Sequence, residues 1–317
     1  MSQPLLIVEH LKKYFSTPNG VLHAVDDVSF SINVGETLGV VGESGCGKST
    51  LGRAILRLHE PTSGNVTFDG KDVLALNKSE LKKMRTKMQM VFQDPFASLN
   101  PQQTVSQAIM EPLLVQRIYK KGNSADLNKK VAQMMDMTGL PKRLVNTYPH
   151  ELDGGLRQRV GIARALALDP KFIVCDEPVS ALDVSIQAQI LNLMQDLQEE
   201  IGLTYMFITH DLSVVKHLSN EIIVMYLGQI VERASSKDLF KAPTHPYTKA
   251  LISAIPTADP THKMNRIILK GEITSPINPA PGCRFAKRCE FARPECFQNN
   301  PQPKEIEPGH FVSCHLA

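Results

Sequence analysis

One stretch, Gly42-Glu-Ser-Gly-Cys-Gly-Lys-Ser-Thr50, constrains the fold of this chain more than any other part of its sequence. It fits the spacing G-x-x-x-x-G-K-[ST] and directly follows the apolar run Leu38-Gly-Val-Val41. A strand that runs into such a loop and then into a helix cradles phosphate groups, because the glycines let backbone N–H groups turn toward the anion. The alternative is a glycine-rich turn without a ligand, but all four fixed positions and the preceding strand favour a phosphate loop.

The residue types assign roles within this loop. Lys48 places a cation on the β- and γ-phosphate oxygens, and Ser49 directs its hydroxyl to Mg²⁺. A helix is expected from Ser49 to about Leu58, with its positive end aimed at the same anion. Phosphate or nucleotide contacts are therefore predicted for these residues: Gly42, Ser44, Gly45, Cys46, Gly47, Lys48, Ser49 and Thr50.

A second apolar strand ends in two adjacent carboxylates, in Lys171-Phe-Ile-Val-Cys-Asp-Glu-Pro178. Open parallel sheets carry their chemistry at this carboxyl edge. Asp176 is suited to hold Mg²⁺ through its water shell, and Glu177 to orient or deprotonate an attacking water. The alternative is a solvated pair of turn carboxylates, which the phosphate loop elsewhere in the chain disfavours. Cys46 and Cys175 are expected to be small packing residues.

Two more apolar runs end in polar side chains. Thr204-Tyr-Met-Phe-Ile-Thr209 is followed by His210, and Met88-Gln-Met-Val-Phe92 is followed by Gln93. His210 could sense or steady a γ-phosphate, although a lone histidine is often structural. Gln93 can bind the metal or the water without carrying charge. Together the runs predict an α/β fold of the P-loop NTPase type, with these residues at one edge of the sheet.

These residues, in this order, resemble the ATP-binding cassette (ABC) family over roughly the first three-quarters of the chain. The resemblance implies that the ring of Tyr14 stacks on adenine, although the residue could be an ordinary surface aromatic. It implies that Gln93 lies in the loop that links the nucleotide to a transmembrane partner, and that Ser180-Ala-Leu-Asp183 crosses a dimer interface. His210 is similar to the family's switch histidine.

The family's signature, Leu-Ser-Gly-Gly-Gln, appears here as Leu152-Asp-Gly-Gly-Leu156. In the family this segment closes over the γ-phosphate bound to the opposite subunit, so Asp153, Gly154 and Gly155 are candidate contacts. An ionised Asp153 cannot donate a hydrogen bond, and at about 4 Å it would repel a phosphate oxygen by on the order of several kcal/mol. Aspartate is also a good N-cap, so Asp153 could simply cap the helix that follows.

These departures suggest an asymmetric dimer with a different, sister ATPase. The site built on Lys48, Glu177 and His210 would hydrolyse ATP, completed by the partner's signature, while the site completed by Asp153 and Leu156 would be degenerate. Lys48, Glu177, His210 and Gln93 are the predicted catalytic residues. Ser49, Gln93 and Asp176 are the predicted Mg²⁺ ligands.

Composition favours a cytosolic ATPase rather than a channel. The 317 residues carry 35 basic and 32 acidic side chains, a formal charge of +3, and 42% hydrophobic residues. No apolar run approaches the roughly 20 residues that span a bilayer, and the N-terminus lacks a signal-peptide core. Basic residues are interspersed with acidic ones, which gives no argument for nucleic acid. We expect a peripheral protein on the cytoplasmic face of the plasma membrane.

The motifs divide the chain into two predicted domains, and two distinct regions lie within the first. Residues from about Pro4 to Gly35 indicate an antiparallel β region, and residues 94–169 indicate a helical subdomain. Residues 1–235 are the predicted nucleotide-binding domain, and residues 236–317 the C-terminal extension, which is richer in proline and cysteine. In that extension, His245-Pro-Tyr-Thr-Lys-Ala-Leu251 and Lys270-Gly-Glu-Ile-Thr-Ser-Pro-Ile-Asn-Pro279 resemble ATPase subunits of peptide and nickel importers, most closely the second of the two ATPases.

The same extension contains Cys283, Cys289, Cys296 and Cys314, spaced Cys-x5-Cys-x6-Cys-x17-Cys. Disulfides are disfavoured in the cytosol, so four clustered thiolates suggest a metal centre, either Zn²⁺ or an iron–sulfur cluster. The absence of a Cys-x2-Cys pair argues weakly against a zinc ribbon. The resemblance to the importer extension favours a [4Fe–4S] cluster. Four reduced cysteines without metal remain the alternative.

The resemblance implies an ATPase that powers the import of dipeptides or oligopeptides. Its partners would be a sister ATPase, two transmembrane permease subunits and, through them, an extracytoplasmic solute-binding protein. Nickel complexes or other small solutes remain possible substrates. A soluble ABC protein acting on ribosomes or DNA is the rival interpretation, but such proteins commonly carry two cassettes, and this chain shows one.

Overall fold

The computed structural model describes residues 4–119, 124–256, 266–269, 271 and 275–317. Contacts divide the chain into two compact units. The first contains residues 33–36 and 72–208, and the second contains residues 4–32, 37–71 and 209–317. Part of the segment that resembles peptide importers, residues 270 and 272–274, lies outside the described residues. The predicted boundary at 235/236 falls inside the second unit and stays a prediction.

The first unit is built on three parallel strands, β6 (Met88–Val91), β7 (Phe172–Asp176) and β8 (Thr204–Thr209). Every residue of β7 and β8 is buried, as expected for near-continuous apolar strands covered on both faces. The register pairs Val91 with Cys175 and Asp176 with Ile208. It thus aligns the carboxyl ends of the three strands, as the sequence predicted.

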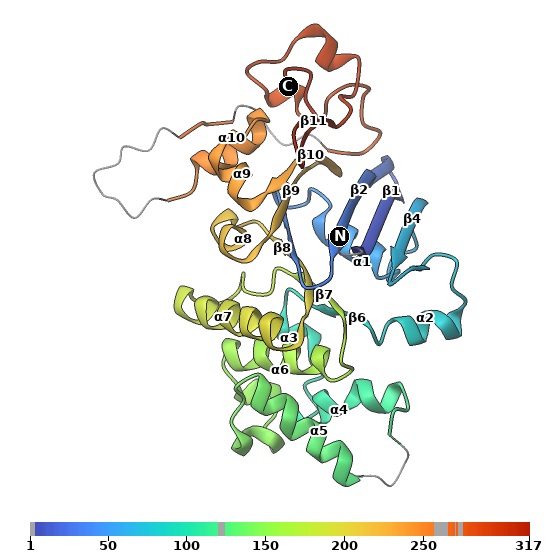
Figure 1. The fold of residues 1–317 in the computed structure, drawn as a ribbon, viewed down its shortest axis with the longest axis vertical. Coiled ribbons are helices and arrows are strands. Elements are labelled where there is room, and N and C mark those ends of the chain that lie inside the picture. The colour runs from blue at the N-terminus through green and yellow to red at the C-terminus, as the bar shows by residue number, and fades with distance from the viewer. Residues whose placement is uncertain (1–3, 120–123, 257–265, 270, 272–274) are drawn as a thin grey trace. The chain divides into compact units, whose positions relative to one another are not determined.

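Helices make up the rest of the first unit (Figure 1). Their bounds are α2 (Lys78–Met84), α3 (Pro95–Ser98), α4 (Val105–Val115), α5 (Ser124–Met137), α6 (Gly154–Leu166) and α7 (Val184–Ile201), with 3-10 turns η1 (Lys142–Asn146) and η2 (Pro149–Glu151). Helix α6 packs on α3, α4 and α5. These helices lie within residues 94–169, and Met134 and Met135 of α5 are buried core residues. The helices share one compact unit with β6, β7 and β8, so a separate helical subdomain stays a prediction.

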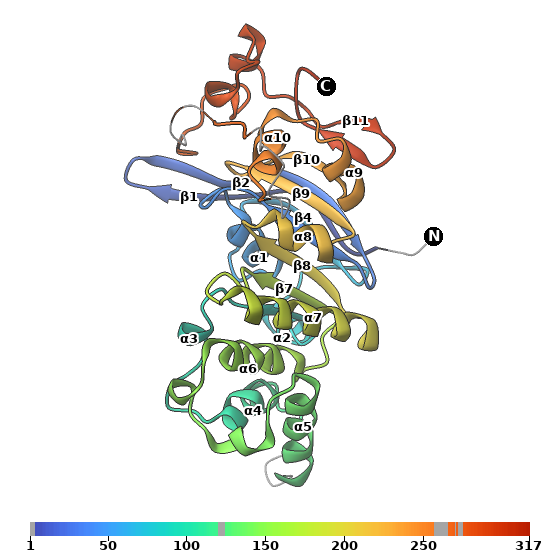
Figure 2. The ribbon, with the colours of Figure 1, turned by 90° about the vertical axis from the view of Figure 1, so that its left-hand side faces the viewer.

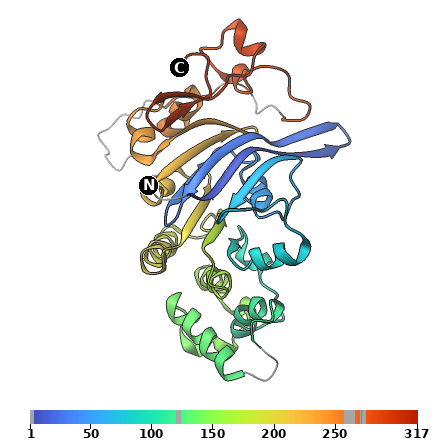
Figure 3. The same cartoon turned by 45° about the vertical axis from the view of Figure 1, so that its right-hand side comes forward.

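The second unit contains two sheets. In one, β3 (Thr37–Val41) pairs in parallel with β9 (Glu221–Tyr226), which continues antiparallel through β10 (Gln229–Ser235), β12 (His310–Val312) and β11 (Lys304–Glu307). The other has the order β2-β1-β4-β5, formed by β1 (Pro4–Thr17), β2 (Gly20–Asn33), β4 (Ser63–Phe68) and β5 (Lys71–Asp72). Figure 3 shows the two long N-terminal strands, in blue, lying along each other.

The helices of the second unit are α1 (Lys48–Ile55), α8 (Leu212–Leu218), α9 (Ser236–Lys241) and α10 (Pro246–Ser253), with 3-10 turns η3 (Ala286–Arg288) and η4 (Pro294–Phe297). Figure 2 shows α9 and α10 from a second side, in orange. Helix α1 begins at Lys48 and ends at Ile55, so it is a few residues shorter than predicted. In the described part of the chain, no helix is long and apolar enough to cross a bilayer.

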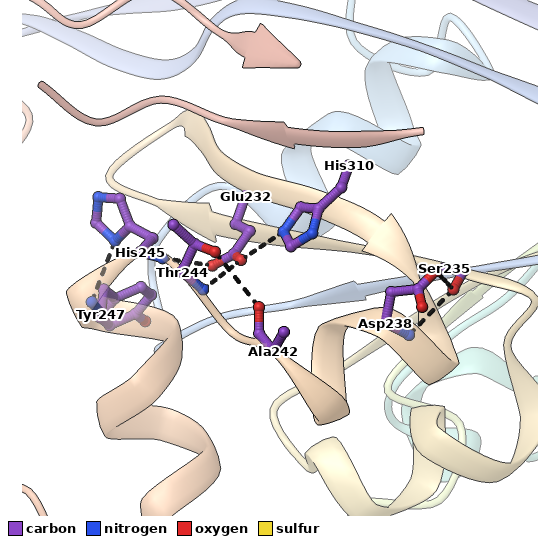
Figure 4. Close-up of polar contacts among 8 residues, drawn as sticks. All are labelled: Glu232, Ser235, Asp238, Ala242, Thr244, His245, Tyr247 and His310. Atoms are coloured by element: carbon purple, nitrogen blue, oxygen red, sulfur yellow. Dashed lines mark hydrogen bonds and ion pairs between the residues drawn. The ribbon is translucent and has the colours of Figure 1, made fainter. Parts of the chain in front are cut away.

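A buried carboxylate on β10 joins three parts of the second unit (Figure 4). Glu232, with 0% of its surface exposed, accepts hydrogen bonds from the N–H groups of Thr244 and His245, at 2.7 and 2.9 Å. The Nε2 of His310, on β12, lies 2.8 Å from the same carboxylate. Burying a polar group without a partner costs free energy. These three hydrogen bonds therefore hold both strand β12 and the corner between α9 and α10 against β10.

Candidate functional site

The phosphate loop runs from β3 to α1 with the backbone that its glycines predict. Gly42, Gly45 and Gly47 all have positive φ, at 155°, 76° and 106°. A Cβ at Gly47 would lie 2.0 Å from the carbonyl oxygen of Ala24, so both conformation and space require glycine there. Ser44 and Gly45 are exposed, which leaves the tip of the loop accessible to a ligand.

Lys48 follows the last glycine of this loop as the first residue of α1, and it is 4% exposed. Its Nζ donates hydrogen bonds to the carbonyl oxygens of Gly42 and Glu43, at 2.8 and 3.0 Å. Cys46 is buried beside it, and burial raises the pKa of its thiol. Burial also raises the pKa of Cys175. Both cysteines are thus packing residues, as predicted.

Glu43 is held by residues of the C-terminal extension. Its backbone N–H donates to the hydroxyl of Tyr247 on α10, at 2.9 Å. Its carboxylate accepts two hydrogen bonds from the guanidinium of Arg288, at 2.7 and 3.1 Å. This fork raises the pKa of Arg288, with the hydrogen bonds to Glu43 as the largest cause.

Tyr14, the predicted adenine-stacking residue, lies on β1 and is packed on one face. The ring of His23 stacks against it, with centroids 3.9 Å apart and planes at 19°. The Tyr14 hydroxyl donates to Asp26, and burial together with this bond raises its pKa. Asp26 also accepts from Arg284 of the C-terminal extension. Burial alone would raise the pKa of Asp26, but Tyr14, Arg284 and His23 lower it below its usual value.

His210 is exposed and directly follows β8. The next residue, Asp211, caps α8 by accepting a hydrogen bond from the N–H of Ser213 at 2.7 Å. The Asp211 N–H donates in turn to the hydroxyl of Thr209, at 3.0 Å. The turn that carries the imidazole is therefore fixed on both sides of His210.

In the first unit, the carboxyl ends of β6 and β7 bring Gln93 and Glu177 together. Gln93 Nε2 donates to Glu177 Oε2 at 3.0 Å. Glu177 has a φ of 46°, and its N–H donates to the carbonyl oxygen of Ile208 at 2.9 Å, which fixes this unusual backbone. Asp176, one residue earlier, is completely buried. The predicted amide and carboxylate thus meet at one edge of the sheet.

The signature segment begins helix α6 as the capping alternative predicted. Asp153 is the N-cap, and its side chain accepts from the N–H of Leu156 at 2.8 Å. Gly154 and Gly155 lie against the start of α7: a Cβ on Gly155 would be 2.7 Å from Ile186. Their N–H groups belong to the first turn of α6, where backbone donors have no partner within the helix.

The segment Ser180–Asp183 precedes α7 and is hydrogen-bonded to Glu177, the residue after β7. Asp183 caps α7 by accepting from the N–H of Ile186 at 3.0 Å, and this bond, with one from Ser185, lowers the pKa of Asp183. Ser180 donates its hydroxyl to the Glu177 carbonyl oxygen at 3.1 Å. The loop predicted to cross a dimer interface therefore begins next to the predicted water-activating residue.

The four cysteines of the extension are free thiols. Burial is the main cause that raises the pKa of Cys283 to about 11, and the thiols of the other three raise it further. The pKa values of Cys289 and Cys314 are raised in the same way. Among the described residues, however, no three His, Cys, Asp or Glu side chains converge so as to hold one metal ion. The structure does not support the predicted iron–sulfur or zinc centre.

Sequence reasoning missed the side chains that support Tyr14 and the phosphate loop. They are His23, Asp26, Glu43, Tyr247, Arg284 and Arg288. The two arginines lie 258 and 245 residues from their acidic partners, and no spacing rule joins positions so far apart. The one available signal was that Glu43 places a carboxylate inside an anion-binding loop, which calls for a countercharge.

Comparisons with known proteins agree with this geometry. Residues 25–180 match the family described as ABC transporter, and residues 231–296 match the one described as oligopeptide/dipeptide transporter, C-terminal region. A putative oligopeptide transport ATP-binding protein of Bacillus subtilis, YkfD, is 53% identical over 99% of this chain and 95% of its own length. The oligopeptide transport ATP-binding protein OppF of Salmonella typhimurium is 52% identical over 96% of this chain and 90% of its own.

The solved structures agree as well. A dimeric post-hydrolysis state of the ATP-binding cassette MJ0796, bound to ADP and Pi, superimposes with a TM-score of 0.67 and 31% identity. The match covers 73% of this chain and 98% of that one. The α/β P-loop fold inferred from the sequence is thereby confirmed.

Proposed function

Because this chain belongs to the ABC transporter ATPases that carry an oligopeptide/dipeptide transporter C-terminal region, we propose that it hydrolyses ATP to power the import of dipeptides or oligopeptides. The observation that carries the proposal is the match over 99% of the chain to a protein described as an oligopeptide transport ATP-binding protein. That match spans nearly the whole chain, the extension included, whereas the match to the MJ0796 cassette covers 73% of the chain.

The ATP-binding residues are assigned by their chemistry. The loop from Gly42 to Thr50 binds the phosphates through its backbone N–H groups, Lys48 adds a cation and Tyr14 offers one ring face to adenine. His23 covers the other face of that ring. Ser49, Gln93 and Asp176 supply oxygen atoms, the donor type that Mg²⁺ prefers, and the ion would neutralise charge on the transferred phosphoryl group.

Glu177 is the residue proposed to activate water. Its carboxylate is oriented by the amide of Gln93, at 3.0 Å, and its backbone is fixed by Ile208. His210 is proposed to steady the γ-phosphate. A positioned general base contributes roughly 10²–10⁴-fold to a rate. Glu177→Gln keeps the hydrogen-bonding shape while removing the base.

The experiment uses the complete transporter in proteoliposomes, with peptide and the binding protein supplied outside. Glu177→Gln should lower ATP hydrolysis and peptide uptake together by at least about 100-fold, while MgATP binding persists. Glu199→Gln, on an exposed turn of α7, is the control and should change neither. Uptake that survives the loss of hydrolysis would refute a role as the motor.

The dimer is proposed to be a heterodimer with one degenerate site. Asp153 caps α6, yet capping leaves its charge in place beside the glycine N–H groups that would face a partner's γ-phosphate. At 4 Å and an effective dielectric of 20, two unit charges repel by about 4 kcal/mol before relaxation and screening. Leu156 adds no polar group that could contact the phosphate. A signature segment able to complete a hydrolysing site would therefore have to come from the sister ATPase. If Glu177→Gln and the equivalent change in the sister reduced turnover equally, the asymmetry would be wrong.

Two permease subunits are the proposed membrane partners, with a solute-binding protein on the far side. Phe92 and Phe96, which flank Gln93, are 37% and 53% exposed, and exposed aromatic side chains are typical of protein interfaces. Binding to the permeases would hold the chain at the cytoplasmic face of the plasma membrane. A pull-down from detergent-solubilised membranes should recover the permeases rather than ribosomal or DNA-bound proteins.

A [4Fe–4S] cluster on Cys283, Cys289, Cys296 and Cys314 is retained as a hypothesis. The alternative, a single Zn²⁺, would need at least three of these thiols to converge on one ion, which the described residues do not show. What favours the cluster is the all-sulfur donor set and the mutual effect of the thiols, which raise one another's pKa. Such a cluster binds each thiolate at a different iron, so the thiols need not converge on one ion. Absence of iron, sulfide and zinc from anaerobically purified protein would eliminate both options.

A further inference from the structure

The C-terminal extension, which lies outside the cassette motifs, touches the proposed ATP site at two points. Arg284 reaches Asp26, the carboxylate that holds Tyr14, and Arg288 reaches Glu43 of the phosphate loop. We propose that these two arginines are positioning residues for ATP, Arg284 on the adenine side and Arg288 on the phosphate side. This inference rests on the proposed ATP site.

The phosphate side depends on a charge inside the loop. Glu43 follows Gly42 directly, and its carbonyl oxygen accepts a hydrogen bond from Lys48 at 3.0 Å. A free carboxylate at this place would repel the phosphates and compete for the same lysine. Arg288 neutralises it with a two-point fork whose planar geometry also fixes the direction of the carboxylate.

Arg288 is well placed to hold that direction. Its side chain is 8% exposed and that of Glu43 is 22% exposed, so the pair is largely shielded from water. Arg288 Nη1 also lies 3.4 Å from the hydroxyl of Tyr226, at the end of β9. Tyr247 fixes the backbone N–H of Glu43. The extension thus holds one loop residue by both backbone and side chain.

The adenine side depends on a chain of contacts. Asp26 accepts from the Tyr14 hydroxyl and from Arg284, and its Oδ2 is 3.4 Å from His23 Nδ1. Arg284 also donates to the carbonyl oxygen of Leu227, and its side chain is 7% exposed. Because Asp26 fixes both the tyrosine and the histidine stacked behind it, loss of Arg284 frees the ring that adenine would meet.

An aromatic anchor keeps the two arginines in place. Phe285, between them in sequence, is buried against Tyr226 and Tyr247, with ring centroids 5.2 and 5.5 Å apart. Pro276 and Asn278, earlier in the extension, accept hydrogen bonds from the N–H groups of His23 and Val21, at 3.0 and 2.8 Å. The extension therefore contacts both the adenine side and the phosphate side of the proposed site.

The test separates base contacts from phosphate contacts. MgATP and magnesium tripolyphosphate, which lacks the base and sugar, are titrated calorimetrically into the full chain carrying Glu177→Gln, so that the nucleotide stays intact. Arg288→Ala should weaken both ligands by about tenfold, as expected when one partner of a shielded ion pair is removed. Arg284→Ala should weaken MgATP by about fivefold and tripolyphosphate by less than twofold, because only ATP stacks on Tyr14.

Three further variants distinguish positioning from damage to the fold. Lys287→Ala, which removes an exposed positive charge from the same turn, should change neither affinity. Arg288→Ala combined with Glu43→Gln should recover most of the lost affinity, because the neutral amide no longer needs a countercharge. Arg288→Lys should retain part of it, since the charge remains but the fork is lost.

The outcomes are distinguishable. Equal weakening of both ligands by Arg284→Ala, or an effect of Arg288→Ala no larger than that of Lys287→Ala, would overturn the positioning roles. So would a double variant no better than Arg288→Ala alone. If the chain with both arginines intact binds neither ligand, the proposed ATP site itself is wrong, and the arginine roles are rejected with it.

Discussion

Glu232→Gln tests how the C-terminal extension is fixed to the second unit. The carboxylate is fully buried, and both of its oxygens accept: Oε1 from the Thr244 N–H with His310 Nε2 also in range, and Oε2 from the His245 N–H. Glutamine has nearly the same shape but only one accepting oxygen. If that oxygen replaces Oε1, the new amide nitrogen faces the His245 N–H, and two donors oppose each other.

The cost follows from the contacts. A buried N–H left without an acceptor costs about 1–3 kcal/mol, and the remaining bonds lose their charge assistance, worth roughly 1 kcal/mol. We therefore expect the free energy that holds β12 and the α9–α10 corner on β10 to fall by about 2–4 kcal/mol. Since 1.4 kcal/mol corresponds to a factor of ten, amides that exchange through opening of this corner should exchange at least about 30-fold faster.

Hydrogen–deuterium exchange of the full chain, read by mass spectrometry, checks this locally. Peptides covering residues 244–250 and 310–312 should lose protection, while those covering β6 and β7 in the first unit should not. Glu221→Gln, on the adjacent strand β9, is the matched control: Glu221 is 24% exposed and pairs with Arg233, so its loss should cost less than about 1 kcal/mol. Equal acceleration of exchange by both variants, or acceleration by Glu232→Gln throughout the chain, would show that this carboxylate does not fix the corner.

Three other predictions address the pH response, the phosphate loop and the signature. Burial lowers the pKa of His245 to about 4, so between pH 6.5 and 4 the unfolded chain binds more protons than the folded chain does. The free energy of unfolding, measured in urea, should therefore fall by about 2 kcal/mol from pH 7 to pH 5. The variant His245→Asn, whose side chain can still cap α10, should show a smaller fall. Gly47→Ala, whose Cβ would lie 2.0 Å from Ala24, should lower the melting temperature more than Gly45→Ala, which has no atom within 4 Å and costs only the roughly 1–2 kcal/mol of a left-handed backbone. Asp153→Ser keeps a capping side chain and removes the charge, so it should raise ATP turnover of the complete transporter several-fold at nearly constant melting temperature; unchanged turnover would contradict the degenerate-site hypothesis.

Much of the proposed catalytic machinery could be predicted because its signals are local. The spacing of Gly42, Gly47 and Lys48 is a short-range pattern, and the positive φ angles there are what glycine permits. Apolar runs followed by Gln93 or Glu177 predicted strand ends, and parallel pairing of β6 with β7 then brought the two side chains to 3.0 Å. The cap at Asp153 was predictable for the same reason, since an N-cap needs only the next three residues.

The metal prediction shows where local reasoning ends. The spacing of the cysteines fixed which donors the extension offers, but not whether they converge, and the described thiols do not gather around one ion. Convergence depends on how loops without regular periodicity pack, and cysteine spacing does not encode that.

The fold class, the phosphate loop, the strand-end residues and the family resemblance can all be inferred from the amino-acid sequence, because each depends on neighbours in the chain or on the period of a strand or helix. The contacts of Arg284 with Asp26, of Arg288 with Glu43 and of Glu232 with His310 are visible only in the folded chain. These pairings join residues as far as 258 positions apart. A charge in the sequence shows that a partner is needed, and only the packing of the folded chain shows which residue supplies it.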